Sequence, residues 1–327
     1  MPAGGEAPRM KYRQLGRWGI QLSTVGLGSW LTYGNAVDKA GARECIKRAY
    51  ECGINFFDTA NVYARGRAEE VVGKALADFP RESVAIATKV YFPMGSGPND
   101  RGLSRKHVFE QLHMSLRRLR VDYVDLYQCH RYDEVTPLEE TCCVMNDLIR
   151  QGKVLYWGVS EWNADQIGEA VEVCLENGWA VPVSNQPEYS MLWRKIEKDV
   201  LQTCEALGLG NVVWSPLAQG VLTGKYSSVD KLPSGSRAAG DQKKFMAEYL
   251  TQPILDAVAE LKTVADGLGA SVSQLALAWC LRQPQVTSVI VGATKPKHVE
   301  DNAGAADLDL SDDVIAQIER VIAPHAL

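Results

Sequence analysis

The sequence predicts a (β/α)8 barrel, and three observations lead to this fold class. The chain has 327 residues, which is long for most single domains but ordinary for one α/β barrel. Short runs rich in β-branched residues alternate with longer helical patterns along the whole chain. Polar residues that can carry chemistry stand at the ends of several of these runs, where barrel enzymes place their active sites.

Eight short apolar runs are expected to form strands, each followed by a helical pattern. The strands are expected at Leu22–Leu27, Asn55–Thr59, Val84–Lys89, Tyr123–Gln128, Leu155–Ser160, Val183–Gln186, Asn211–Trp214 and Val289–Val291. The helices are expected at Asp38–Cys52, Ala68–Asp78, Ser104–Leu119, Leu138–Gln151, Asp165–Asn177, Ile196–Leu207, Leu255–Leu268, Ser273–Leu281 and Asp312–Ile322. An open doubly wound sheet shows a similar alternation, so the pattern alone leaves both architectures open.

Three segments lie outside this repeat. Residues 1–10 are rich in Pro, Gly and Ala and lack the apolar run of a signal peptide, so we expect a disordered leader. Met10–Ile20 precedes the first strand and is expected to form a hairpin that closes the barrel floor. Leu217–Leu250 follows strand seven, and a loop of that length in a compact domain predicts a lid. Residues 11–327 are expected to form a single domain.

Composition excludes several classes of partner. The net charge of −5 argues against nucleic acid and anionic membranes, which require a basic excess. No run reaches the roughly 20 apolar residues of a membrane helix, so no membrane insertion is expected. The 8 cysteines show no regular spacing, which favours reduced thiols in a cytoplasmic protein. The 5 histidines lie far apart, and no metal site is expected.

Candidate catalytic residues follow from the strand ends. Asp58 ends the second expected strand, Lys89 ends the third, His130 follows the fourth, and Tyr63 lies in the loop after the second. Asp58 can keep Lys89 protonated, and the ammonium would lower the phenol pKa of Tyr63. His130 can orient a carbonyl oxygen by a hydrogen bond. The set suits protonation of a carbonyl that receives a hydride.

Each of these residues also has a purely structural interpretation. Asp58 could cap a helix, Tyr63 could be a surface aromatic, and His130 could be a hydrogen-bonded rim residue. Lys89 is harder to explain in this way, because lysine is rarely buried without a partner. An aromatic substrate pocket is a further possibility, formed by Trp30, Tyr91, Phe92 and Trp193.

Several longer segments match a known family. They are Asn55–Tyr63, Thr88–Lys89, Leu116–Leu119, Asp122–Leu126, Gly158–Ser160, Gln186–Ser190, Trp214–Ala218, Gly220–Tyr226 and Gly292–Thr294. With these segments the chain resembles the aldo-keto reductase superfamily over nearly all of Met10–Pro324. Gly28–Gly34 and Arg101–His107 resemble the branch that holds potassium-channel β-subunits and their bacterial and plant relatives.

The resemblance implies NADPH-dependent reduction of aldehydes or ketones to alcohols, with Tyr63 as general acid in a tetrad with Asp58, Lys89 and His130. It implies NADPH extended across the barrel mouth, with Trp214 stacked on the nicotinamide and Lys295 suited to the 2′-phosphate. The implied cofactor residues are Ser29, Trp30, Asp58, Ser160, Gln186, Trp214, Ser215, Pro216, Leu217, Gly220, Lys225, Arg237, Gly292, Thr294, Lys295, His298, Asp301 and Asn302. It also suggests a homo-oligomer, a tetramer or higher.

Two departures from the relatives bear on function. Animal channel β-subunits commonly have Asn at the position of His130, and a histidine here favours turnover over a purely sensory role. Glu161 replaces a basic residue, which puts one cofactor contact in doubt. Two alternatives stay open: an NADPH-binding regulatory subunit with little turnover, and a hydrolase that uses Asp58 with other carboxylates and binds no nicotinamide. The carbonyl substrate itself is not specified by the sequence.

Overall fold

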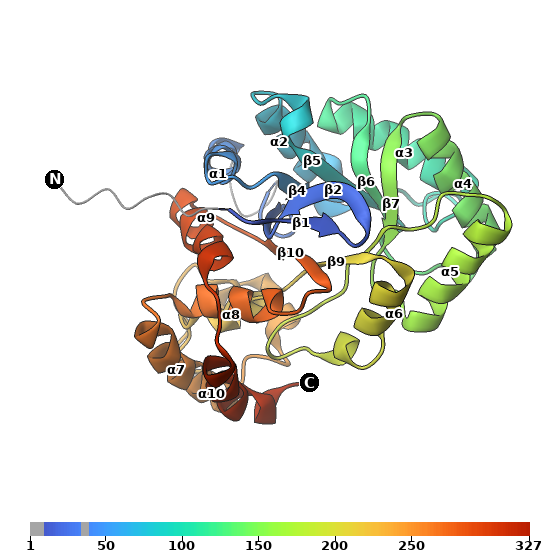
Figure 1. The fold of residues 1–327 in the computed structure, drawn as a ribbon. Helices are drawn as coiled ribbons and strands as arrows, with labels where there is room; N and C mark the ends of the chain where they lie inside the picture. Colours follow the sequence, from blue (N-terminus) through green and yellow to red (C-terminus); the bar gives the residue numbers. More distant parts are fainter. Residues whose placement is uncertain (1–9, 34–38) are drawn as a thin grey trace.

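The computed structural model describes residues 10–33 and 39–327, and it shows a closed barrel of eight parallel strands inside a ring of helices (Figure 1). The strands follow chain order from β3 to β9, and β10 pairs with both β9 and β3 to close the barrel. The predicted (β/α)8 barrel is therefore confirmed. The open doubly wound sheet is excluded, because no strand of this sheet is left as an edge.

The expected strands and helices correspond to barrel elements with shifted ends. The barrel strands are β3 (Val25–Gly28), β4 (Phe56–Asp58), β5 (Ala85–Val90), β6 (Val124–Cys129), β7 (Val154–Val159), β8 (Ser184–Asn185), β9 (Gly210–Val213) and β10 (Val286–Val291). The helices are α1 (Lys39–Glu51), α2 (Arg67–Leu76), α3 (Arg105–Leu119), α4 (Leu138–Arg150), α5 (Ala164–Glu176), α6 (Val200–Leu207), α7 (Gln252–Gly267), α8 (Val272–Leu281), α9 (Pro296–Ala303) and α10 (Asp312–Ile322). Asp38, the expected start of the first helix, lies outside the described residues.

Local sequence sets several of these helix ends. Ser104 accepts a hydrogen bond from the backbone N–H of His107 and begins α3, as its position predicts. Asn163 with Gln166, and Ser271 with Gln274, form capping boxes at the starts of α5 and α8. Gly152 follows α4 at a φ of +67°, a left-handed conformation that glycine adopts without strain.

The expected hairpin at 10–20 is present but longer. It consists of β1 (Tyr12–Leu15) and β2 (Trp18–Ser23), which lie across one end of the barrel (Figure 1). Leu22, expected in the first barrel strand, therefore belongs to the hairpin. The apolar run spans two strands because both are buried: Leu22 packs under the barrel with Leu15 and Phe56, while Val25 starts the barrel wall.

Met10 is the residue of the expected leader that the structure describes. Its side chain is 9% exposed and packs in the main core, and it accepts a weak bond from the hydroxyl of Thr24. Residues 1–9 lie outside the described residues. The core itself has two parts: a large cluster between barrel and helices, and a smaller one at the hairpin end.

Segment 217–250, expected to be a lid, folds as short 3₁₀ turns at Ala218–Thr223, Arg237–Ala239 and Asp241–Met246. We call 217–250 the mouth segment. Its Phe245 ring meets Trp30 at 5.5 Å between centroids, and the hydroxyl of Tyr249 donates to Glu188 at 3.0 Å. The mouth segment is thus held against the carboxyl ends of the strands.

Helices α7 and α8 are the most apolar consecutive pair and pack against each other and the barrel. Among the described residues, no single helix is long and apolar enough to cross a membrane. Taken together, α7 and α8 meet that test by length and composition alone, with a bend of 86° between them.

Candidate active site

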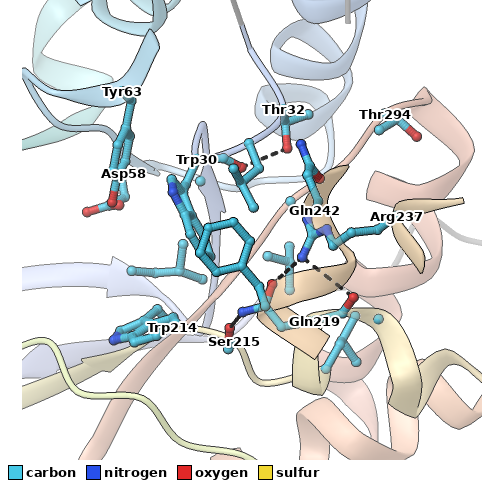
Figure 2. Close-up of a pocket in the computed structure, with 18 of the residues that line it drawn as sticks. Trp30, Thr32, Asp58, Tyr63, Trp214, Ser215, Gln219, Arg237, Gln242 and Thr294 are labelled. Carbon is cyan, nitrogen blue, oxygen red and sulfur yellow. Dashed lines mark hydrogen bonds between the residues drawn. The ribbon is translucent and has the colours of Figure 1, made fainter. Parts of the chain in front are cut away.

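A cavity of about 1170 Å³ lies at the carboxyl ends of the barrel strands, opposite the hairpin. Its wall combines residues from strand ends, such as Asp58, Ser160 and Trp214, with residues of the mouth segment, such as Arg237 and Phe245. Figure 2 shows Tyr63 and Asp58 on one side of Trp30, and Gln219 and Arg237 on the other. In α/β barrels this end is where chemistry takes place.

A buried ion pair forms the base of one side. Lys89, at 0% exposure, donates from Nζ to Oδ1 of Asp58 at 2.6 Å and to the carbonyl of Thr59 at 2.8 Å. The second carboxylate oxygen of Asp58 accepts from Nε2 of Gln186 at 2.9 Å. These bonds, rather than a helix cap, account for Asp58. They also supply the partner that a buried lysine requires.

Tyr63 lies over this pair. It begins the turn Tyr63–Gly66, and its hydroxyl is 3.4 Å from Nζ of Lys89. Burial raises the pKa of Tyr63 well above its ordinary value, and the charge of Asp58 adds to the rise. The direction is opposite to the one expected from the sequence, because burial and the charge of Asp58 outweigh the opposing charge of Arg131. Tyr63 is therefore a protonated phenol, able to donate but not to act as a base.

The turn that carries Tyr63 is strained. The next two residues, Ala64 and Arg65, have φ values of +49° and +55°, in the left-handed region that non-glycine residues seldom occupy. Such conformations cluster at functional sites, where the surrounding structure holds them in place. The strained pair directly follows Tyr63, at the wall of the cavity.

His130 completes the group. It follows β6, and its ring centre is 5.7 Å from that of Tyr63. Burial holds the pKa of His130 well below its ordinary value, and the charges of Lys89 and Arg131 lower it further. The ring is therefore neutral at physiological pH. Its Nδ1 is buried without a hydrogen-bond partner among the described residues, so the imidazole is not an ordinary hydrogen-bonded rim residue.

Most of the other residues singled out by the sequence also line this cavity. They are Trp30, Asp58, Ser160, Gln186, Trp214, Ser215, Pro216, Leu217, Gly220, Lys225, Arg237, Gly292, Thr294, His298, Asp301 and Asn302. Ser29 lies behind the wall, where its hydroxyl donates to that of Thr59 at 2.8 Å. Lys295 is exposed at the start of α9, outside the wall.

The aromatic pocket differs from the one the sequence suggested. Trp30 and Phe92 line the cavity, but Tyr91 and Trp193 do not. Trp193 instead meets Tyr249 of the mouth segment, at 6.4 Å between ring centres. Phe245 of the mouth segment also lines the cavity. The sequence did not predict this, because the position of Phe245 depends on its packing against Trp30 and not on a sequence pattern.

A hydrogen-bonded chain that the sequence did not reveal joins the mouth segment to Ser215, two residues after the end of β9. Arg237 donates to the side-chain oxygen of Gln219, and the amide of Gln219 donates to the hydroxyl of Ser215 (Figure 2). Gln219 is buried and has a φ of +58°. No periodicity marks such a residue in an irregular segment, so only the folded structure identifies it.

Glu161 holds the indole of Trp214. Its Oε1 accepts from Nε1 of Trp214 at 2.8 Å and from the backbone N–H of Glu188 at 2.6 Å. Glu161 also has a φ of +60°, directly after Ser160. The acidic residue that stands in place of a basic one therefore has a structural role: it fixes the Trp214 ring at the cavity wall.

Comparison with known proteins agrees with this geometry. Residues 24–323 match the sequence profile described as the Aldo/keto reductase family. The chain is 45% identical to a probable voltage-gated potassium channel subunit beta of Oryza sativa subsp. japonica, over 96% of this chain and 97% of that protein. It is 44% identical to a protein of the same description from Arabidopsis thaliana, with the same coverage.

A more distant relative shows the same correspondence. The putative voltage-gated potassium channel subunit beta of Schizosaccharomyces pombe is 40% identical over 95% of this chain and 93% of that protein. Both the profile and these relatives span the barrel from β3 to the C-terminal helices. The chain therefore belongs to the aldo/keto reductase family.

Proposed function

We propose that this protein is an NADPH-dependent oxidoreductase that reduces aldehydes or ketones to alcohols, with Tyr63 as general acid. The observation that carries the proposal is the buried Lys89–Asp58 pair with the Tyr63 hydroxyl 3.4 Å from Nζ, at the mouth of the barrel. A protonated phenol beside a fixed ammonium suits proton donation to a carbonyl oxygen. Membership of the family supports the same reaction class.

The far side of the cavity fits a phosphorylated cofactor. Lys225 and Arg237 line it, and within the described part of the chain neither forms an ion pair with a carboxylate. Unpaired cations of this kind are what a pyrophosphate requires. Trp214, fixed by Glu161, offers a flat ring at the other end. When bound, NADPH supplies the hydride.

The side chains of the chain itself have separate tasks. The neutral imidazole of His130 holds the carbonyl oxygen in place, and the hydroxyl of Tyr63 gives its proton to that oxygen. Lys89 then faces the phenolate oxygen and stabilises it until a proton returns. Asp58 keeps Lys89 charged and in place, and Gln186 keeps Asp58 in place.

Tyr63→Phe tests this mechanism. The change keeps the ring and removes the donor, so kcat for aldehyde reduction is expected to fall by roughly 10²- to 10⁴-fold. The NADPH dissociation constant, measured by fluorescence titration, is expected to stay the same. Tyr91→Phe is the matched control, because Tyr91 lies outside the cavity wall. A Tyr63→Phe protein within a fewfold of native kcat would refute the mechanism.

A second candidate function is a regulatory subunit that binds NADPH with little turnover. It is favoured by the likeness to proteins described as potassium channel β-subunits. A native protein that binds NADPH but oxidises it with no carbonyl in a broad panel would support this function instead. The hydrolase alternative has no support, because both carboxylate oxygens of Asp58 are bound by Lys89 and Gln186.

A further inference from the structure

We propose that the substrate is a carbonyl compound that also carries an anionic oxygen group, a carboxylate or a phosphate, and that Arg131 binds this group. Arg131 would then be the residue that determines substrate specificity. The inference rests on the proposed function, because it names the class of substrate for the same cavity. It arises from a cation in the cavity wall that the sequence did not single out.

The distribution of cations in the cavity is the first observation. Among the residues that the structure describes, three arginine or lysine side chains line it: Arg131, Lys225 and Arg237. Lys225 and Arg237 belong to the side proposed for the cofactor phosphates. Arg131 immediately follows His130, on the side of the catalytic group. The proposed cofactor site therefore does not use the charge of Arg131.

A series of ring contacts places Arg131 close to the reacting groups. Its guanidinium carbon is 5.6 Å from the centre of the Phe92 ring. The Phe92 ring is 4.9 Å from that of His130, which in turn is 5.7 Å from Tyr63. A single small molecule can therefore place its anionic group on Arg131 and its carbonyl group between His130 and Tyr63.

The guanidinium of Arg131 is available for a ligand. Nη1 donates to the backbone carbonyl of His130 at 2.5 Å, which steadies the side chain, and no bond from its other N–H donors is found to the residues that the structure describes. Within the described part of the chain, no ion pair of Arg131 is found. An arginine stays charged at any relevant pH and can hold a carboxylate or phosphate through two parallel bonds.

The rest of this side of the cavity suits the remainder of such a substrate. Trp30, Phe92 and Phe245 supply flat apolar walls, and Phe92 contacts both Arg131 and His130. An apolar or short carbon skeleton can pack against these rings. Only the two ends of the molecule then need polar partners, Arg131 at one and His130 with Tyr63 at the other.

Arg131 has a competing interpretation, in which it only steadies His130 or tunes the catalytic group. Its charge lowers the pKa of Tyr63 and of His130, and it bonds to the His130 backbone. A residue with only that role would affect every carbonyl substrate alike. A residue that binds an anion would affect anionic substrates far more than neutral ones.

The experiment compares matched substrates in native protein and in Arg131→Gln. 4-Formylbenzoate is paired with its methyl ester, which has the same aldehyde without the charge. Glycolaldehyde phosphate is paired with glycolaldehyde, so that a preference for phosphate is distinguished from one for carboxylate. Arg150→Gln is the control, because it removes an exposed charge at the end of α4, away from the cavity.

Native protein is expected to show the higher kcat/KM for at least one anionic member of the pairs. Arg131→Gln is expected to lower that preference by about 10- to 100-fold, mainly through KM, because a charge-assisted bond is lost. Its loss of kcat/KM with the neutral member is expected to be much smaller than its loss with the anionic member. Rising salt should weaken the native preference, since ionic attraction is screened.

Three results would overturn the inference. Native protein that reduces charged and neutral members equally well leaves Arg131 without an anion to bind, while the proposed function stands. Equal losses on both members in Arg131→Gln would assign it the role of positioning His130. Native protein that reduces no member of either pair overturns the proposed function itself, and the inference with it.

Discussion

Asp58 and Lys89 show how a single side chain is tied to the fold. Each is almost fully buried, and each is acceptable there only because the other neutralises it at 2.6 Å. Removing one partner of such a pair typically costs about 3–5 kcal/mol, since the other charge stays buried alone. The chemistry of the site and the stability of the barrel are therefore not separable at these two positions.

Glu188 gives a residue-level prediction about pH. Burial raises its pKa from 4.5 to about 7, although the Tyr249 hydroxyl bonded to it acts in the opposite direction. Between these values the folded protein binds more protons than the unfolded chain, so the free energy of unfolding falls as pH rises. Glu188→Gln removes this dependence, since an amide does not titrate.

The midpoint of thermal unfolding tests this. Glu188→Gln is expected to gain stability relative to native between about pH 5 and pH 8, by roughly 1–3 kcal/mol. Glu172→Gln, an exposed change on α5, should show no such trend. A difference between Glu188→Gln and native that is constant with pH would contradict the raised pKa.

Lys295 carries the prediction about cofactor choice. It is exposed at the start of α9, whose residues His298, Asp301 and Asn302 line the cavity. We expect Lys295→Ala to weaken NADPH binding by about 1–2 kcal/mol and to leave NADH binding unchanged, because only NADPH has a 2′-phosphate. Lys297→Ala, two residues further along the same helix, is the control. Equal native affinity for both cofactors would contradict the expectation.

At the scale of elements, the burial of their side chains decided which strands and helices could be predicted from the sequence. The barrel strands were found because most of their residues are buried and read as apolar runs. The same property misled the assignment at Leu22, where floor and wall are equally apolar. Helix α9 has eight residues, mostly polar, and carries little periodic signal. The turns of the mouth segment depend on tertiary contacts that no local pattern records.

The residues of the candidate site also fall into a group that the sequence predicts and a group that it does not. Asp58 ends β4, Lys89 is the last residue but one of β5, and His130 follows β6, so strand assignment alone brought them together. Gln219 and Phe245 lie in irregular chain, and their directions follow from contacts with Ser215 and Trp30. No sequence pattern marks Arg131, because the direction of a side chain after a strand end is set by its neighbours.

The mouth segment allows a prediction about its motion. Phe245 and Tyr249 hold it over the cavity, and Arg237 joins it to the barrel through Gln219. If cofactor exchange requires this segment to open, bound NADPH should slow tryptic cleavage at Lys231, Lys243 and Lys244. Cleavage at the half-buried Lys153, in the loop between α4 and β7, serves as the reference. Equal rates at the mouth segment with and without NADPH would show that it is no lid.

At the scale of the whole molecule, packing protects the thiols. All 8 cysteines are free, and every one except Cys143 is buried. A thiol reagent should therefore modify about one cysteine quickly in native protein and all of them after unfolding, since only thiolates that reach solvent react. Cys143→Ser should abolish the fast phase. Several thiols reacting at once in native protein would indicate a looser packing than the structure has.

The hairpin end of the barrel has a consequence for protein engineering. A Cβ on Gly16, whose φ is +60°, would come within 2.3 Å of the carbonyl of Gly208 and 2.6 Å of the amide of Gly210. Backbone from the two halves of the chain meets there with no room for a side chain. Libraries that aim at new substrate specificities should therefore randomise the opposite rim and leave this end untouched, since in such barrels the loops at the carboxyl ends of the strands tolerate variation and the other end serves stability.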